Sequence, residues 1–89
     1  GLYGGGKVKE LLKTVRPLDD FVLEAEFTGG TVKRYDITPL FDEIPTFQEI
    51  RRNPELFRDV KVIGCGYAVG WNDDLDLACE EIWENGMTV

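Results

Sequence analysis

The feature that most constrains the fold is a strict alternation of apolar and polar side chains in residues 21–27. Every second position is apolar, and two of the positions between them are glutamates. A period of two is typical of a β-strand with one buried face. The inward positions are Phe21, Leu23, Ala25 and Phe27, which alternate with Val22, Glu24 and Glu26.

Thr28-Gly29-Gly30 joins this strand to a second run, residues 31–37, and the length of the loop decides which side chains meet. A two-residue loop would turn Tyr35 toward solvent. A three-residue loop with Gly30 in the left-handed conformation instead places Tyr35 opposite Leu23 on one apolar face. Because burial favours this register, we predict the pairs Phe27–Thr31, Leu23–Tyr35 and Phe21–Ile37.

The remaining residues are expected to add short strands and helices to this hairpin. A strand is predicted around Lys9 to Pro17, and a second hairpin runs from Val60 across Gly64-Cys65-Gly66 through Tyr67 and Val69 to Trp71. Three helical turns are expected to lie across one sheet face. Thr38 is predicted to cap the first, with Pro39 at its first position, Thr46 is predicted to cap the second, and Asn53-Pro54 opens the third. The last element is predicted as a helix from about Leu77 to Asn85, closed by Asn85-Gly86. Leu75, Ala78 and Ile82 are expected to face the core, with Trp83 as a further candidate, and Glu80, Glu81 and Glu84 are expected to face water.

These elements predict an α+β fold: a small antiparallel sheet of about four to five strands, with short helical turns in the middle and a C-terminal helix. The 89 residues suffice for one core, so we assign a single domain to residues 8–89, after a flexible lead-in over residues 1–7. Gly1 to Val8 fits most of a phosphate-binding loop pattern. It is not expected to bind phosphate, because Val8 lacks the hydroxyl that would contact magnesium.

Charge is distributed unevenly along the chain. The net charge is −7, and residues 62–89 hold six acidic residues and no basic one. Such a surface repels phosphate backbones and suits a basic partner, although a solvated acidic helix is the simpler interpretation. The apolar runs are far shorter than a transmembrane helix, so we expect no membrane partner.

Histidine and serine are both absent from the sequence. Without an imidazole, neither a Ser-His-Asp nor a Cys-His nucleophile can be assembled. Two cysteines alone do not fill the tetrahedral shell of zinc. We therefore expect no enzyme activity, and no catalytic, cofactor-binding or metal-binding residues.

The two cysteines, Cys65 and Cys79, are expected to be reduced thiols. The sequence shows no signal peptide before them, which favours a cytoplasmic location. A Cys65–Cys79 disulfide is the alternative, because one residue follows a strand and the other lies on the helix expected to pack nearby.

Five short motifs follow one another along the chain. They are Phe21-x-Leu23-x-Ala25-x-Phe27-x-Gly29-Gly30, Tyr35-Asp36-Ile37-x-Pro39-Leu40, Phe57-x-x-Val60-x-Val62, Gly66-x-x-Val69-x-Trp71 and Asp76-Leu77 before a helix. Their order, over residues 14–86, resembles the bacterial domain-of-unknown-function family 2442.

This resemblance implies a small α+β domain with antiparallel strands and a C-terminal helix, and no established catalytic activity. It also implies a setting either in short proteins or beside helix-turn-helix DNA-binding segments, and gene neighbourhoods similar to toxin-antitoxin pairs. The sequence differs in having no helix-turn-helix extension after Gly86, so a DNA-binding role is not expected for this domain alone.

Three groups of residues are candidates for a site. Oxygen ligands in the cluster Asn72, Asp73, Asp74 and Asp76 suit a hard cation, but we favour capping of the following helix by Asp74 or Asp76. Asp36 is interpreted first as a turn residue and second as an acid that faces a cleft. Trp71 is expected in the core, in phase with Val69 and Tyr67, and Trp83 at an interface.

The favoured hypothesis is a non-enzymatic protein-interaction module, as one half of a toxin-antitoxin-like pair, with a protein partner on Glu80, Glu84 and Trp83 of the acidic helix or on an exposed strand edge. One alternative is a nucleic-acid-associated regulator that uses Lys33, Arg34, Arg51 and Arg52, with Arg58 and Lys61 as further basic residues. The other is a magnesium- or manganese-dependent enzyme that uses Asp73, Asp74 or Asp76. The oligomeric state is left open.

Overall fold

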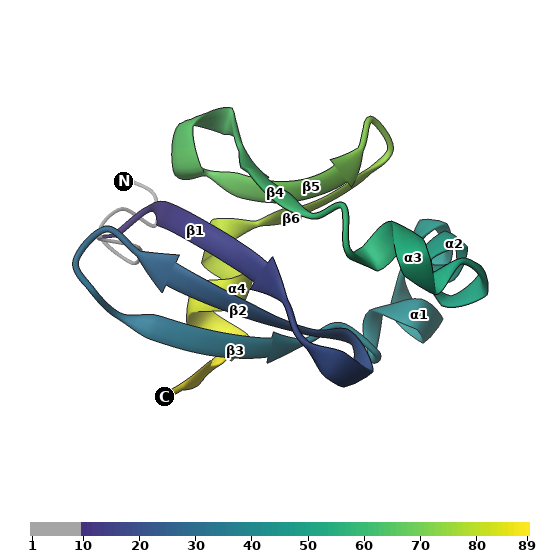
Figure 1. Cartoon of the computed structure of the whole chain (residues 1–89), viewed down its shortest axis with the longest axis horizontal. Coiled ribbons are helices and arrows are strands. Elements are labelled where there is room, and N and C mark those ends of the chain that lie inside the picture. Colours follow the sequence, from purple (N-terminus) through teal and green to yellow (C-terminus); the bar gives the residue numbers. More distant parts are fainter. Residues whose placement is uncertain (1–9) are drawn as a thin grey trace.

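Antiparallel strands and short helices make up the computed structural model, which describes residues 10–89 (Figure 1). One sheet has four strands in the order β1 (Leu12–Pro17), β2 (Val22–Phe27), β3 (Val32–Asp36) and β7 (Met87–Thr88). The other has three, in the order β4 (Lys61–Ile63), β5 (Ala68–Asn72) and β6 (Leu75–Ala78). The helices are α1 (Leu40–Glu43), α2 (Gln48–Arg52), α3 (Pro54–Phe57) and α4 (Cys79–Asn85), with 3-10 turns at Asp19–Phe21, Pro45–Phe47 and Gly64–Gly66.

The predicted α+β class is confirmed, and the strands form two sheets where one sheet was expected. The predicted lead-in over residues 1–7 and the pattern at Gly1 to Val8 lie outside the described residues.

The β2–β3 hairpin has the predicted register. Leu23 pairs with Tyr35, and the Phe27 amide donates to the Thr31 carbonyl at 2.8 Å. Gly30 has a φ of +96°, in the left-handed region that a side chain rarely adopts. The three-residue loop is therefore confirmed, and it turns the apolar side chains of β2 to the buried face.

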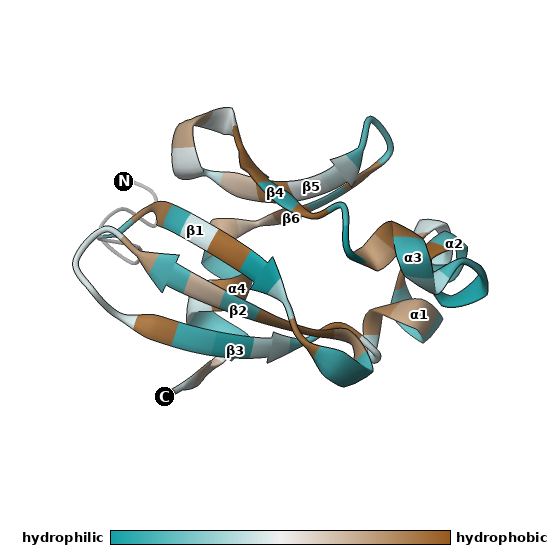
Figure 2. Ribbon diagram, viewed as in Figure 1, coloured by the Kyte–Doolittle hydropathy of each residue, from teal (hydrophilic) through white to brown (hydrophobic). Residues whose placement is uncertain are grey.

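Helix α4 covers one face of the four-stranded sheet, behind β1–β3 in the view of Figure 1. It contacts β3 of this sheet and both β5 and β6 of the other, so the core lies among the helix and the two sheets. Hydrophobic and hydrophilic residues alternate along the strands (Figure 2). None of the helices described is long and apolar enough to cross a membrane.

The three helical turns lie together at one end of the sheets, not across a face as expected (Figure 1). Aromatic side chains join them to the strands. The Phe47 and Trp71 rings meet edge to face with centroids 5.6 Å apart, and Trp71 Nε1 donates to the Phe57 carbonyl at 3.2 Å. Trp71 is buried as predicted, because its indole fills the junction between β5 and the turns. Neither Thr38 nor Thr46 caps a helix through its side chain, which corrects both of those expectations.

The last helix begins later than predicted. Residues 75–78 form strand β6, since Leu75 and Leu77 are buried in alternation with the exposed Asp76 and Ala78. Ala78 is therefore not in the core, and Tyr67, which precedes β5, is 64% exposed. The predicted end at Asn85 is confirmed. A Cβ on Gly86 would lie 2.5 Å from the Ile82 carbonyl oxygen, so only glycine fits there.

Candidate interaction surface

Helix α4 carries the residues predicted to contact a partner. Glu80 and Glu84 are exposed one turn apart, whereas Trp83 is partly buried. The Trp83 ring packs edge to face on Phe27, with centroids 4.9 Å apart, and Lys33 Nζ lies 4.9 Å from its centroid. The same ammonium group donates to the Trp83 carbonyl at 2.5 Å. Two intramolecular partners thus occupy Trp83, while the glutamates remain accessible.

A shallow depression of about 450 Å³ lies between β3, α1 and α4. Its lining combines two aliphatic residues, Pro39 and Leu40, with three carboxylates from three separate elements. The lining residues are Tyr35, Asp36, Pro39, Leu40, Glu43, Glu81 and Asn85. We call Asp36, Glu43 and Glu81, with the neighbouring Glu80 and Glu84 of α4, the acidic face.

Tyr35 is the polar centre of this depression. Its hydroxyl donates to Glu81 Oε2 at 2.8 Å, and Asn85 Nδ2 donates to the same oxygen at 2.9 Å. Burial, the hydrogen bond to Glu81 and the charges of Glu81, Glu43 and Asp36 all raise the pKa of Tyr35. The hydroxyl therefore stays protonated and holds Glu81 in place. Among the described residues, Glu81 Oε1 has no hydrogen-bond donor and remains open to one from outside.

Asp36 forms a turn at the end of β3, as the first of its two interpretations predicted. Its Oδ1 accepts the Thr38 amide at 2.9 Å and the Thr38 hydroxyl at 2.8 Å. The Thr38 hydroxyl is directed back to Asp36, and Pro39 occupies the N-cap position of α1. Because Asp36 also lines the depression, it serves both the turn and the acidic face.

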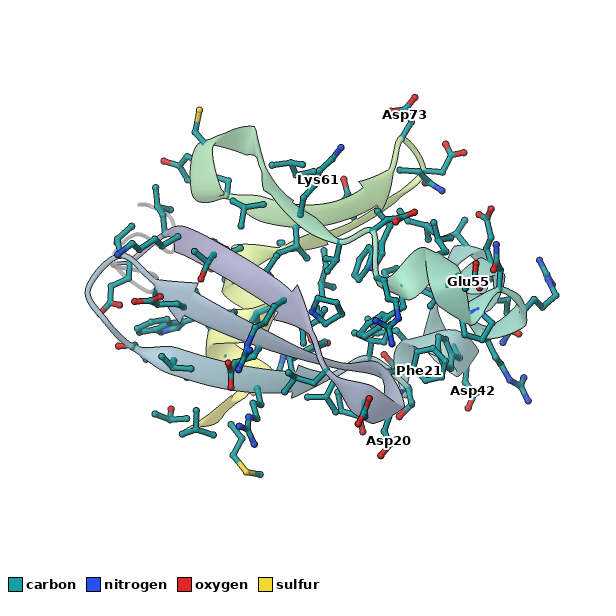
Figure 3. The ribbon with its side chains drawn as sticks, viewed as in Figure 1. Asp20, Phe21, Asp42, Glu55, Lys61 and Asp73 are labelled. Atoms are coloured by element: carbon teal, nitrogen blue, oxygen red, sulfur yellow. The ribbon has the colours of Figure 1, made fainter. Side chains whose placement is uncertain are left out.

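The cluster from Asn72 to Asp76 is a hairpin turn between β5 and β6, so the prediction that it caps a helix is wrong. Asn72 Oδ1 accepts the Asp74 amide at 2.9 Å, and Asp73 points away at the tip of the hairpin (Figure 3). Asp76 lies in β6, opposite Gly70. Within residues 10–89, no three carboxylate, thiol or imidazole groups are placed to hold a metal ion.

The basic residues predicted to contact nucleic acid divide into two kinds. Lys33 is engaged with Trp83, and Arg34 Nε bonds Glu24 Oε2 at 3.1 Å. On the other side Arg16 bonds Glu24 Oε1 at 2.8 Å, and these two arginine hydrogen bonds lower the pKa of Glu24. Arg51, Arg52, Arg58 and Lys61 are exposed, as is Arg34, but within residues 10–89 the first four form no ion pair.

Both cysteines are free thiols, so the alternative of a Cys65–Cys79 disulfide is not realised. Cys65 is exposed in the β4–β5 turn, with a φ of +57°. Cys79 is buried at the start of α4, and burial, followed by the charge of Glu80, raises its pKa.

Pattern reasoning missed the Tyr35–Glu81 pair and the depression around it. One available signal was the predicted register, which buries Tyr35, because a buried tyrosine hydroxyl needs a hydrogen-bond partner. The identity of that partner depends on how α4 docks, 46 residues further along the chain.

The chain is similar to a solved structure and to a protein family. One similar solved structure is the "Putative DNA Binding Protein NE0471" from Nitrosomonas europaea ATCC 19718, with a TM-score of 0.63 and 26% identity. The similarity covers 72% of this chain and 41% of that one, so the chain matches less than half the length of that protein. No curated protein matches. A family described as "Protein of unknown function (DUF2442)" matches residues 12–88. The chain therefore belongs to the DUF2442 family.

Proposed function

We propose that this domain is a non-enzymatic protein-interaction module that binds a basic segment of a partner protein on its acidic face. The observation that carries the proposal is the convergence of Asp36, Glu43 and Glu81, from β3, α1 and α4, around one shallow depression. A toxin-antitoxin-like pair in the cytoplasm, where thiols such as Cys65 and Cys79 stay reduced, is the setting we propose for it.

The chemistry of the depression suits lysine and arginine. Pro39 and Leu40 offer apolar surface to the methylene stem of such a side chain, while the carboxylates accept hydrogen bonds from its charged end. Tyr35 and Asn85 already hold Glu81 in place, so less conformational entropy is lost on binding. None of the residues that line the depression is basic, so no lysine or arginine of the lining competes for its carboxylates.

Two features favour binding over catalysis. The hollows in the described part of the chain are shallow, at about 280 to 450 Å³, and lie open at the surface. The core of residues 10–89 buries no carboxylate, lysine or arginine, whereas enzymes commonly use desolvated acids or bases in a closed cleft.

The test is a binding measurement with a labelled, arginine- and lysine-rich peptide of about a dozen residues, followed by fluorescence anisotropy. The triple variant Asp36→Asn, Glu43→Gln, Glu81→Gln keeps the hydrogen-bond acceptors and removes three charges. With about 0.5 kcal/mol for each exposed charge pair, binding should weaken about tenfold.

A matched control removes the same number of charges elsewhere. In the variant Glu55→Gln, Asp73→Asn, Asp74→Asn the substitutions lie on α3 and in the β5–β6 hairpin, and none of these residues lines the depression. Figure 3 labels Glu55 and Asp73. This variant should bind the peptide within about twofold of the parent, because distant exposed charges are screened. Equal losses in the two triple variants would mean non-specific attraction and would refute the proposal. The native protein should also capture a stoichiometric partner that the acidic-face variant releases.

A second candidate, nucleic-acid binding, is supported by the name of the similar Nitrosomonas europaea protein. The exposed Arg51, Arg52, Arg58 and Lys61 are the residues that would contact phosphate. This function predicts retardation of duplex DNA at low salt, with an affinity that falls steeply as salt is added. Absence of retardation at low salt would eliminate it for this domain.

A further inference from the structure

Strand β7 forms one edge of the four-stranded sheet. It pairs with β3 on one side, and no strand of residues 10–89 pairs with its other side. The opposite edge of the sheet is different, because β1 lies beside β4 and the turn at Gly64–Gly66. There a Cβ on Gly66 would lie 2.8 Å from the Leu12 carbonyl oxygen, so the turn packs closely on β1. Of the two edges, the one at β7 is open.

The pairing of β7 determines which of its backbone groups are free. Lys33 lies opposite Thr88, and Arg34 lies opposite Met87. The Val89 amide donates to the Val32 carbonyl at 3.0 Å. Because inward and outward groups alternate along an antiparallel strand, Met87 and Val89 bond to β3 and the Thr88 amide and carbonyl point outward. The edge therefore presents one unpaired donor and one unpaired acceptor on the same residue.

Two apolar side chains flank these free groups. Met87 is 75% exposed and Val89 is 62% exposed, and both lie on the sheet face opposite α4. The face follows from the register: Lys33 reaches Trp83 of α4, so the side chains of Val32 and Arg34 point the other way, together with their partners Val89 and Met87. Val32, Met87 and Val89 thus form an apolar strip along the open edge.

We propose that β7 pairs with β7 of a second copy of this chain, antiparallel, with Thr88 on the two-fold axis. The Thr88 amide of each copy donates to the Thr88 carbonyl of the other, so both free backbone groups are satisfied. The same register places Met87 of one copy beside Val89 of the other, twice. The edge is therefore self-complementary, as a two-fold interface requires.

A second copy fits this edge because one register both pairs the free Thr88 backbone groups and brings Met87 of each copy beside Val89 of the other. The strip contains no acidic residue, so the net charge of −7 opposes pairing only at longer range. Added salt screens that repulsion, and association should strengthen as salt is raised. The contact is small, so the equilibrium should respond to concentration in the micromolar to millimolar range, about −8 to −4 kcal/mol.

Sedimentation equilibrium of the whole chain gives the first test. The weight-average mass should rise from 10.1 kDa toward twice that value as concentration increases, and more so at high salt. Met87→Lys should abolish the rise, since a charge enters the strip. Tyr67→Lys is the matched control: it also replaces an exposed apolar residue, at the far β4–β5 turn, and should leave the rise unchanged. A constant monomer mass up to about 1 mM would overturn the proposal.

Cross-linking tests the register itself. In a Cys65→Gly background, which removes the exposed thiol, Thr88→Cys should form an intermolecular disulfide under mild oxidation. The two Thr88 Cα atoms would be about 5.5 Å apart in a hydrogen-bonded pair, within disulfide range. Met87→Cys should cross-link at least tenfold more slowly, because residue 87 lies diagonally across the axis from its copy. Equal rates for the two variants would contradict this register. Neither readout depends on the acidic face.

Discussion

Phe21 occupies a backbone conformation that a bulky residue rarely adopts. Both Asp20 and Phe21 have φ values of +62° in the tight turn between β1 and β2. The Phe21 ring points toward the helical turns (Figure 3). It meets Phe41 and Phe57 edge to face, with centroids 5.2 and 5.4 Å away. Packing of the ring therefore stabilises the turn against its own backbone strain.

The packing of the ring and the strain of the backbone can be measured separately with the variants Phe21→Ala and Phe21→Gly. Loss of a fully buried phenylalanine ring costs about 3–5 kcal/mol, so the partly buried ring of Phe21 should cost about 2–3 kcal/mol in either variant. Glycine also relieves about 1–2 kcal/mol of left-handed strain, and its greater backbone freedom in the unfolded chain costs about 0.5–1 kcal/mol. The glycine variant should therefore be the more stable one, by about 0.5–1 kcal/mol.

Urea unfolding followed by tryptophan fluorescence measures this difference. Val22 provides the control, since it is the next residue and has an ordinary φ of −103°. At Val22 the order should reverse, with alanine more stable than glycine by about 0.5–1 kcal/mol. If Phe21→Ala proved as stable as Phe21→Gly, or more so, the ring would not be holding a strained backbone and the reasoning would be refuted.

Three further predictions concern Tyr35, Glu24 and Trp71. The raised pKa of Tyr35 contributes stability that is fully present below pH about 10 and is lost as pH rises above it. Tyr35→Phe should flatten this alkaline loss in urea unfolding, and parallel curves would contradict it. The lowered pKa of Glu24 contributes stability present above pH about 4.3 and lost as pH falls further. Glu24→Gln should make the acid side of the stability profile shallower, and an unchanged acid limb would exclude this contribution. Trp71→Phe leaves the Phe57 carbonyl unpaired in the core, which should lower the unfolding free energy by about 2 kcal/mol. A loss below about 0.5 kcal/mol would contradict that bond's role.

The sequence alone predicted the β2–β3 hairpin, including its register. Strict alternation defines which face of a strand is buried, and a one-residue slip would expose that face. Only the three-residue loop with Gly30 in the left-handed region keeps Leu23 and Tyr35 together. The burial of Trp71 and the helix end at Asn85 followed in the same way, because each depends on residues close together in the chain.

The boundary between β6 and α4 was not predictable in this way. Leu75-Asp76-Leu77-Ala78 is four residues long and lies next to a helix, so its pattern fits the first turn of that helix as well as a short strand. These residues form a strand because they pair with β5 through backbone hydrogen bonds. Asp73 and Asp74 consequently form the turn of the β5–β6 hairpin, and no residue from Asn72 to Asp76 lies at the start of a helix.

The sequence determined that the C-terminal third is acidic and that the 89 residues contain no histidine and no serine. It also predicted that Glu80, Glu81 and Glu84 face water, which holds for Glu80 and Glu84, whereas Glu81 is half-buried. Only the tertiary structure brought Asp36, Glu43 and Glu81 around Tyr35, and only it covered Trp83 with Phe27 and Lys33. The physical reason is separation along the chain. Periodicity reports which side of its own strand or helix a residue occupies, whereas a surface built from three elements depends on how those elements pack.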